Sequence, residues 1–204
     1  MPLREIANYY CSHNGLFRVI PQKIKERRNS QIKPRILIPS SEIEAGVSRL
    51  ATDIRRDYLG VNLLVISILK GSFIFTADLI RRLDLPLEVH FVQLSSYGRR
   101  MESAGKVQLM QPLNCPVKGR HILVIEDIVD TGKTVSFIME YLKREQPASL
   151  KLCALLDKPC RRVVPVTIDY FGFIAPDKFI VGYGIDWDEK FRYLPDICAL
   201  EDEG

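Results

Sequence analysis

Residues 122–134 constrain the fold and chemistry of this chain more than any other stretch. They read Ile-Leu-Val-Ile-Glu-Asp-Ile-Val-Asp-Thr-Gly-Lys-Thr, so an uninterrupted apolar run ends at two adjacent carboxylates, Glu126 and Asp127. Such a run is typical of a strand that is buried on both faces of a parallel sheet. Apolar residues at helical spacing follow Thr134. The segment therefore predicts a strand that ends at the carboxylates, then a tight turn and a helix N-terminus.

The turn in this segment has the chemistry of a phosphate-binding site. Backbone N–H groups point out of such a turn, the helix dipole is positive there, and Thr131 and Thr134 add hydroxyl groups. The turn is not a Walker A loop, because the first glycine and the spacing of that motif are missing. Glu126 and Asp127 would repel a bare phosphate, but they suit the hydroxyl groups of a sugar phosphate. An open α/β sheet binds its ligands at this edge.

Strands and helices alternate along the rest of the chain. Apolar runs predict strands at residues 62–69, 87–94, 150–156 and 163–171, and a short apolar segment at 179–184. Helical spacing predicts helices at about 41–58 and 72–83. Ser41-Glu42-Ile43-Glu44 has the form of a capping box. Residues 95–111 are polar and predict a long mobile loop or a loose hairpin. This order is typical of an α/β fold with a mostly parallel, doubly wound sheet.

Composition predicts a soluble protein of the cytoplasm. The five cysteines are scattered and form no C-x-x-C pair, which is typical of a reduced intracellular chain without a structural zinc site. No signal peptide or apolar run of about 18 residues is visible, so we expect no membrane contact. A basic cluster at residues 23–35 could bind nucleic acid, but no aromatic side chains interleave with it. With a net charge of only +4, a solvated or subunit-contacting extension fits better, and we expect no nucleic-acid partner.

Residues 124–134 resemble the phosphoribosyl-pyrophosphate (PRPP) motif of the type I phosphoribosyltransferases, and most closely that of the hypoxanthine-guanine phosphoribosyltransferases. Leu69-Lys70-Gly71 is similar to the pyrophosphate-binding loop of this family, in which a cis peptide joins the lysine to its neighbour. Ser96-Tyr97 resembles a pair on the lid that closes over the reacting centre. Lys158 and residues 179–186 are similar to segments that contact the base and the metal.

The resemblance implies the type I phosphoribosyltransferase fold. This fold is a mostly parallel, twisted sheet flanked by helices, with a small hood built from N-terminal and C-terminal segments. The resemblance covers about residues 36–200, so we expect a single domain at 36–204 whose hood includes about 172–204. An N-terminal extension of unclear role, residues 1–35, precedes this domain. The family resemblance also implies a homodimer or homotetramer.

The resemblance gives each site residue an expected role. Asp130 is the expected catalytic residue, which takes the proton from purine N7 as the base attacks. The residues expected to bind the ribose and 5′-phosphate of PRPP are Glu126, Asp127, Asp130, Thr131, Gly132, Lys133 and Thr134. Those expected to bind pyrophosphate are Lys70, Gly71 and Arg192, and those of the lid are Ser96 and Tyr97. Those expected to bind the purine are Lys158, Phe179, Ile180 and Asp186. The expected ligands of Mg²⁺ are Asp186, Glu126 and Asp127.

These roles imply a purine salvage transferase. It would move the 5-phosphoribosyl group from PRPP to N9 of hypoxanthine or guanine, giving IMP or GMP and pyrophosphate. A xanthine-preferring enzyme is one alternative, because Trp187 stands where the family more often has Tyr or Phe. A non-catalytic PRPP-binding regulator is another, although the presence of Lys158, Phe179 and Asp186 speaks against it. Asp130 speaks against the third alternative, a catalytically silent homologue.

Overall fold

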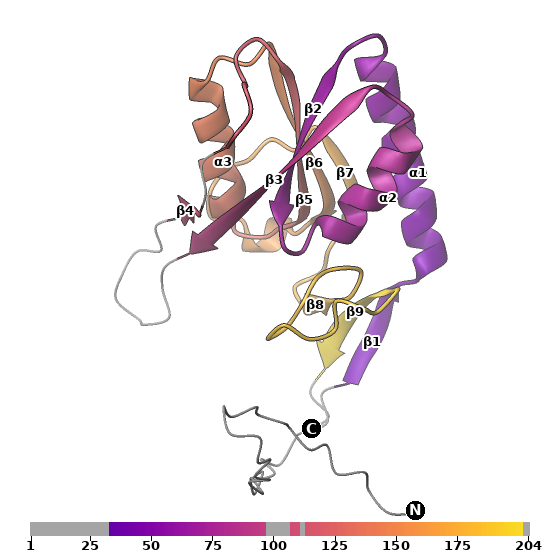
Figure 1. The fold of residues 1–204 in the computed structure, drawn as a ribbon. Coiled ribbons are helices and arrows are strands. Elements are labelled where there is room, and N and C mark those ends of the chain that lie inside the picture. The colour runs from indigo at the N-terminus through magenta and orange to yellow at the C-terminus, as the bar shows by residue number, and fades with distance from the viewer. Residues whose placement is uncertain (1–32, 97–106, 111–112, 202–204) are drawn as a thin grey trace, which may run out of the picture. The chain divides into compact units, whose positions relative to one another are not determined.

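A six-stranded sheet of order β4-β3-β2-β5-β6-β7 forms the centre of the computed structural model, which describes residues 33–96, 107–110 and 113–201 (Figure 1). Its strands are β2 (Leu63–Leu69), β3 (Leu87–Ser96), β4 (Val107–Leu109), β5 (His121–Val129), β6 (Ser149–Asp157) and β7 (Tyr170–Ile174). Strands β3, β2, β5, β6 and β7 pair in parallel, whereas β4 runs antiparallel to β3. The predicted mostly parallel α/β sheet is confirmed.

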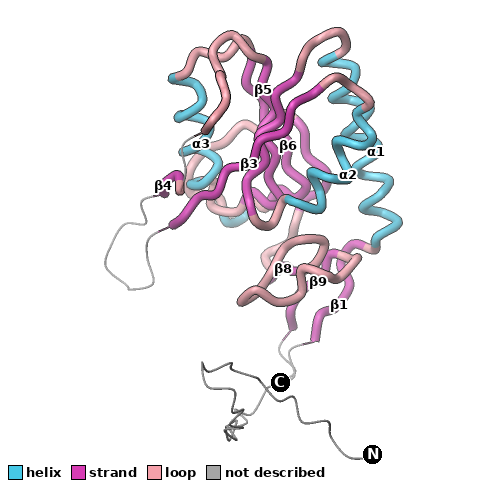
Figure 2. Tube along the Cα trace, in the orientation of Figure 1, coloured by secondary structure: helices cyan, strands magenta, loops and turns pink. Residues whose placement is uncertain are grey.

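Helices cover both faces of this sheet, as Figure 2 shows in cyan. Helices α1 (Ser40–Tyr58) and α2 (Phe73–Leu83) pack on one face, and α3 (Lys133–Arg144) packs on the other. Side chains of β5 alternate between the two cores: Leu123 and Ile125 join the core under α1 and α2, and Ile122 and Val124 join the core under α3. All four are fully buried. This two-sided burial explains why β5 is an unbroken apolar run.

A second, three-stranded antiparallel sheet joins the two ends of the described chain. It consists of β1 (Lys33–Ile38), β9 (Ile197–Glu201) and β8 (Phe179–Val181), in that order. The predicted hood from N-terminal and C-terminal segments is confirmed by this sheet. Residues 33–35 of the expected N-terminal extension lie in β1, and residues 1–32 lie outside the described part of the chain. Within that part, no helix is long and apolar enough to cross a membrane.

Three local predictions were wrong, and the backbone explains each. The capping box does not form: α1 begins at Ser40 without a side-chain cap, because the carbonyl of Pro39 accepts the N–H groups of Glu42 and Ile43 at 2.9 and 3.0 Å. Residues 163–169 lie outside any strand, and β7 begins only at Tyr170. The N–H groups of Val163 and Val164 donate to a loop carbonyl instead of a strand. Finally, β5 does not end at the carboxylates but continues to Val129, because its pairing with β6 runs that far.

The remaining predicted elements are confirmed: strands at 62–69, 87–94 and 150–156, and helices at 41–58 and 72–83. The segment 95–111 begins and ends in strand, because β3 extends to Ser96 and pairs with β4. Its middle, residues 97–106, lies outside the described residues.

Candidate active site

The turn between β5 and α3 is held in a conformation that only glycine tolerates at its centre. Gly132 has a φ of 83° and precedes the first residue of α3. A Cβ at this position would lie 2.5 Å from the carbonyl oxygen of Val164. The carbonyl of Thr131 accepts the N–H groups of Val163 and Val164, both at 3.0 Å. The turn is therefore fixed against residues 163–164, with its amides beside the N-terminus of a twelve-residue helix.

A small cavity of about 70 Å³ opens along this turn. Its lining residues are Glu126, Ile128, Val129, Asp130, Thr131, Gly132, Thr134 and Val135. Five of these belong to the predicted PRPP set, so the structure brings them together. Lys133, the first residue of α3, is solvent-exposed, and its N–H donates to Oγ1 of Thr131 at 3.4 Å. Five of the seven predicted sugar-phosphate residues thus line one concave surface, whereas Asp127 and Lys133 do not line it.

Two buried carboxylate oxygens on this surface have no hydrogen-bond partner among the described residues. They are Oε2 of Glu126 and Oδ1 of Asp130. Burial, followed by the adjacent Asp127, raises the pKa of Glu126 well above its usual range. Burial also raises the pKa of Asp127 to about 6, although backbone N–H donors and Arg192 oppose the shift. Buried polar atoms are normally paired, so unpaired ones at a cavity suit a site that binds hydroxyl groups, a proton or a cation.

Arg162 is a site residue that sequence reasoning missed. Its Nε donates to the carbonyl of Asp130 and its Nη2 to the carbonyl of Val129, both at 3.0 Å. The same Nη2 forms an ion pair with Asp157 at the end of β6. Arg162 therefore fixes the backbone that carries Asp130. Its position shortly after a predicted strand end was the only signal, and the neighbouring Arg161 shares that signal.

Three segments meet at Gly71. The peptide bond between Leu69 and Lys70 is cis, which confirms the predicted non-proline cis peptide at this loop. A Cβ at Gly71 would overlap the carboxylate of Asp127, which lies two residues before the end of β5. A Cβ at Gly184, in the hood, would overlap the carbonyl oxygen of Gly71. Gly71 therefore lets the β2–α2 loop approach the side chain of Asp127, and Gly184 lets the hood approach the backbone of that loop.

The charged residues predicted to bind pyrophosphate and metal form one ion-pair cluster. Nη2 of Arg192 lies 2.7 Å from Oδ1 of Asp186 and 3.1 Å from Oε2 of Glu189. The other oxygen of Glu189, Oε1, lies 2.7 Å from Nζ of Lys70. The carboxylate of Glu189, which was not predicted, therefore bridges the two cations. These contacts place Lys70, Asp186 and Arg192 together, as the sequence prediction requires.

The predicted purine residues lie where β6 approaches the hood. Lys158 is only 5% exposed, and its Nζ donates to the carbonyl of Lys178 at 2.8 Å and lies 3.7 Å from Oδ1 of Asp177. Phe179 is 58% exposed, so its ring is free to stack, whereas Ile180 is buried. Of the predicted lid pair, Ser96 is the last residue of β3, and Tyr97 lies outside the described residues.

The acidic residues of the site fit a metal ion only in part. No three His, Cys, Asp or Glu side chains converge on a common point within the described ranges. Mg²⁺ often takes only one or two carboxylates and completes its shell with water and substrate phosphates. The unpaired Oε2 of Glu126 fits such a shared site. Asp186 fits only after rearrangement, because its oxygens engage Arg192 and the N–H of Glu189.

Comparison with known families identifies this constellation. The model of the phosphoribosyl transferase domain matches residues 37–188, from β1 to the segment that follows β8. The chain belongs to this family. The resemblance expected from residues 124–134 is confirmed, and with it the phosphoribosyltransferase fold.

Three relatives show how far the similarity extends. The chain is 41% identical over 180 residues to the hypoxanthine-guanine phosphoribosyltransferase of Aquifex aeolicus, and the similarity covers 88% of this chain and 100% of the relative. It is 42% identical over 169 residues, 83% of the chain, to the bifunctional protein TilS/HprT of Listeria monocytogenes, but spans only 26% of that protein. A crystal structure of a hypoxanthine-guanine phosphoribosyltransferase from Bacillus anthracis is 44% identical, with a TM-score of 0.79, over 84% of this chain and 100% of that one.

Proposed function

We propose that this phosphoribosyltransferase is a purine salvage enzyme that transfers the 5-phosphoribosyl group from PRPP to N9 of hypoxanthine or guanine. The products are IMP or GMP and pyrophosphate. One observation carries the proposal: two buried, unpaired carboxylate oxygens, on Glu126 and Asp130, lie on the concave surface of an anion-binding turn. A plain phosphate would be repelled there, whereas a phosphorylated sugar supplies hydroxyl donors next to its phosphate. The names of the relatives support the same activity.

The turn holds the 5′-phosphate in this proposal. The amides of residues 131–134 and the hydroxyl groups of Thr131 and Thr134 face it, at the N-terminus of α3. Glu126 and Asp127 accept the ribose hydroxyls. Because both carboxyl groups have raised pKa values, hydroxyl donors and a cation would restore the charged form that burial disfavours.

The leaving pyrophosphate binds at the cluster of Lys70, Gly71, Asp186 and Arg192. Lysine and a forked guanidinium provide the positive charge that a departing pyrophosphate needs. Mg²⁺ is the proposed cofactor; Asp186, Glu126 and Asp127 would hold it, and it supplies further positive charge to the pyrophosphate oxygens. Ser96 and Tyr97 form the lid that excludes water from the reacting centre.

The purine is bound by Lys158, Phe179 and Ile180, with Asp186 nearby. Nζ of Lys158 has only donors, so it suits the 6-oxygen of hypoxanthine and guanine and disfavours the 6-amino group of adenine. Phe179 stacks on the base. The unpaired Oδ1 of Asp130 receives the proton from N7 as N9 attacks the ribose carbon.

The same proposal covers the organisation of the protein. Residues 36–204 form the transferase domain, with a hood that includes 172–204, and residues 1–35 are an extension whose last three residues enter β1. We place the enzyme in the cytoplasm as a homodimer or homotetramer, without a nucleic-acid partner. The four cysteines in the described ranges are all free, which supports a reducing compartment.

The decisive experiment measures nucleotide formation from PRPP and Mg²⁺ with hypoxanthine, guanine, xanthine, adenine and uracil offered separately. We expect turnover of hypoxanthine and guanine, with adenine and uracil inert. A xanthine-preferring enzyme is the second candidate, because Trp187 stands directly after Asp186, where the family more often has Tyr or Phe. Nζ of Lys190 lies 6.0 Å from the centre of the Trp187 ring. Faster turnover of xanthine would favour it. Binding of PRPP without turnover of any base would instead indicate a regulator or a silent homologue.

A further inference from the structure

The hood loop, residues 182–185, precedes Asp186 and has an unusual backbone. Gly182, Tyr183 and Gly184 all have positive φ angles, of 96°, 48° and 96°. Reciprocal hydrogen bonds between Gly182 and Ile185, at 2.9 and 3.0 Å, close the loop. Positive φ is uncommon for a bulky residue such as tyrosine and persists only where surrounding contacts hold it. Something must therefore fix Tyr183 in place.

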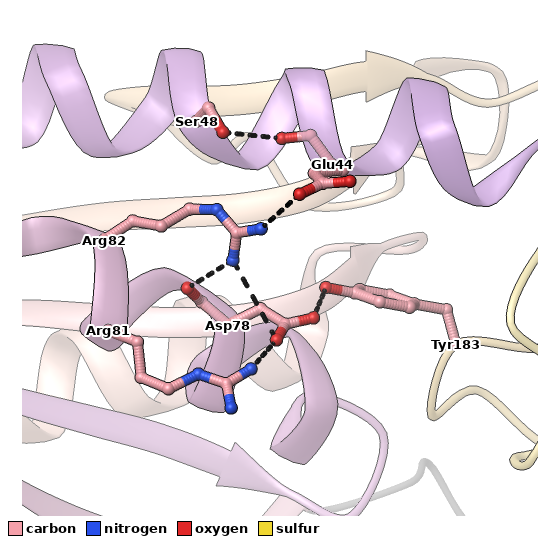
Figure 3. Close-up of polar contacts among 6 residues, drawn as sticks. All are labelled: Glu44, Ser48, Asp78, Arg81, Arg82 and Tyr183. Atoms are coloured by element: carbon pink, nitrogen blue, oxygen red, sulfur yellow. Dashed lines mark hydrogen bonds and ion pairs between the residues drawn. The ribbon is translucent and has the colours of Figure 1, made fainter.

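Figure 3 shows the polar contacts that connect the side chain of Tyr183 to α2 and α1. Its hydroxyl donates to Oδ2 of Asp78, on α2, at 2.6 Å. Asp78 also forms an ion pair with Arg81, and its Oδ1 lies 4.0 Å from Nη1 of Arg82. Nη2 of Arg82 continues to Oε1 of Glu44, on α1, at 3.2 Å. A chain of polar contacts thus connects the hood loop to both helices of one face.

The hydroxyl of Tyr183 remains a donor over the whole working range of pH. The side chain is 8% exposed, and burial, followed by the hydrogen bond to Asp78, raises its pKa above the usual value. A buried phenol that donates to a carboxylate makes a strong, charge-assisted hydrogen bond. The hydroxyl of Tyr183 therefore stays protonated, and able to donate, near neutral pH.

The opposite side of the same loop faces the proposed pyrophosphate site. Gly184 lies so close to the carbonyl of Gly71 that a Cβ would overlap it. The carbonyl of Gly184 accepts Nη1 of Arg192 at 2.8 Å, and Arg192 pairs with Asp186. Any shift of Tyr183 is consequently passed to its neighbour Gly184, and from there to Gly71 and Arg192.

We propose that Tyr183 and Asp78 are positioning residues for the pyrophosphate end of PRPP, because their hydrogen bond fixes the loop that places Gly184, Asp186 and Arg192. The inference rests on the proposed function. Neither residue belongs to the predicted PRPP or purine set. Apart from Asp186, the residues proposed to contact the base are Lys158, which follows β6, and Phe179 and Ile180 in β8, so the effect of the bond should fall mainly on PRPP and pyrophosphate.

The chain contains a matched control. Tyr170, at the start of β7, is also 8% exposed, and its hydroxyl donates to Oδ2 of Asp57 at 2.6 Å. Its other polar contact is Nζ of Lys151, at 2.9 Å. Tyr170 and Tyr183 thus share burial, donor distance and a carboxylate acceptor, but within the described part of the chain Tyr170 makes no hydrogen bond with the hood loop or with Gly71. Removing each hydroxyl compares a proposed positioning bond with a bond of equal length elsewhere.

The experiment compares Tyr183→Phe, Tyr170→Phe and the wild type. For Tyr183→Phe we expect the KM for PRPP to rise about fivefold to tenfold, with the KM for hypoxanthine within about twofold of wild type. Equilibrium binding of PRPP without a base should weaken by the same factor. Tyr170→Phe should leave both constants unchanged. If Tyr183→Phe does not fold, Asp78→Asn, which keeps an acceptor oxygen but loses the charge, should show a smaller shift in the same direction.

Three results would overturn the inference. The KM for PRPP could stay at the wild-type value, the two KM values could rise together, or Tyr170→Phe could give the same change as Tyr183→Phe. The wild-type arm separates this failure from that of the proposed function. A wild type that binds no PRPP overturns both, whereas an active wild type with an unaltered Tyr183→Phe variant overturns the positioning role alone.

Discussion

The two sides of the candidate active site satisfy their charges in opposite ways. On the turn side, formed by the end of β5 and the start of α3, Oε2 of Glu126 and Oδ1 of Asp130 are buried without partners among the described residues. On the hood side, every predicted charge already has a partner: Arg192 pairs with Asp186, and Glu189 connects Arg192 to Lys70. The turn side has buried oxygens without hydrogen-bond partners. The hood side already contains an internal anion, the carboxylate of Glu189, between its two cations.

This difference indicates what binding must do on each side. On the turn side, a ligand adds hydrogen bonds to desolvated carboxylates. Without a ligand, these carboxylates lower the free energy of unfolding relative to apolar side chains at the same positions. On the hood side, a ligand replaces ion pairs in which Lys70 and Glu189 are exposed and Arg192 and Asp186 are partly buried, and ion pairs open to solvent are individually weak. We therefore expect substitutions on the turn side to change catalysis and stability strongly, and substitutions on the hood side to change affinity modestly.

The largest expected effect tests the unpaired oxygen of Asp130. Asp130→Asn keeps the shape of the side chain but removes its ability to take a proton from N7, so we expect kcat to fall on the order of 10²-fold or more. The KM for PRPP should change little, because the backbone contacts of Arg162 with Val129 and Asp130 remain. Steady-state kinetics with hypoxanthine checks this. Near-normal turnover would remove Asp130 from the proton transfer.

The next largest effect is expected for Lys158, which follows β6 and donates to the carbonyl of Lys178 in the hood. Lys158→Ala removes a buried donor, so we expect the KM for hypoxanthine to rise about 30-fold and the KM for PRPP to rise much less. Lys151→Ala is a suitable control, because Lys151 also pairs with an aspartate, Asp57, but lies outside the predicted site. Equal increases in the two KM values would contradict a base-reading role for Lys158.

Stability against pH tests the desolvated carboxylates directly. Burial raises the pKa of Asp127 to about 6, above its usual value of 3.8, so the native state binds more protons than the unfolded state between these values. The free energy of unfolding should therefore fall as pH rises from about 4 to 6, and the loss should persist above pH 6. Asp127→Asn should stabilise the free protein by about 1 to 2 kcal/mol at pH 7.5 and by less at pH 4.

Urea unfolding at the two pH values measures this effect. Because the pKa of Glu126 is raised by the same burial, Glu126→Gln should act in the same direction. Asp169→Asn, a carboxylate outside the predicted site that accepts the N–H of Leu152 at 2.8 Å, is a control that should not stabilise. Destabilisation by Asp127→Asn at pH 7.5 would mean that the buried carboxylates are better satisfied in the free protein than these contacts indicate.

The turn side could be predicted from sequence because its residues are contiguous. The apolar run of β5, the carboxylates, and Asp130 to Thr134 follow one another within a single strand, turn and helix. The position of Lys158 also followed from the strand before it. The errors arose where backbone groups replaced expected partners, as when the carbonyl of Pro39 capped α1 and when Thr131 took the N–H groups of Val163 and Val164.

The hood side was predictable only in part, because its contacts join distant parts of the chain. The resemblance pointed to Asp186 and Arg192, but no local pattern indicated that Glu189 would reach Lys70, 119 residues earlier. The hydrogen bond between Tyr183 and Asp78 spans 105 residues and was likewise invisible. Such contacts depend on how the two sheets pack together, which hydrophobic periodicity does not specify.

The smallest expected effect addresses the internal anion of the hood side. Glu189 is largely exposed, and its hydrogen bonds with Lys70 and then Arg192 hold the pKa of its carboxyl below its usual range. It is therefore charged at neutral pH and competes with pyrophosphate for the same two cations. We expect Glu189→Gln to lower the KM for PRPP about twofold to threefold at low salt, with the difference fading at about 0.5 M salt.

Asp188→Asn is the control: it removes the same charge one residue away, where the carboxylate lies 4.0 Å from Lys190, and should leave the KM for PRPP unchanged. A rise in the KM for PRPP on Glu189→Gln would instead show that Glu189 orders Lys70 and Arg192 for binding. Its ion pairs would then favour binding on the hood side and not oppose it.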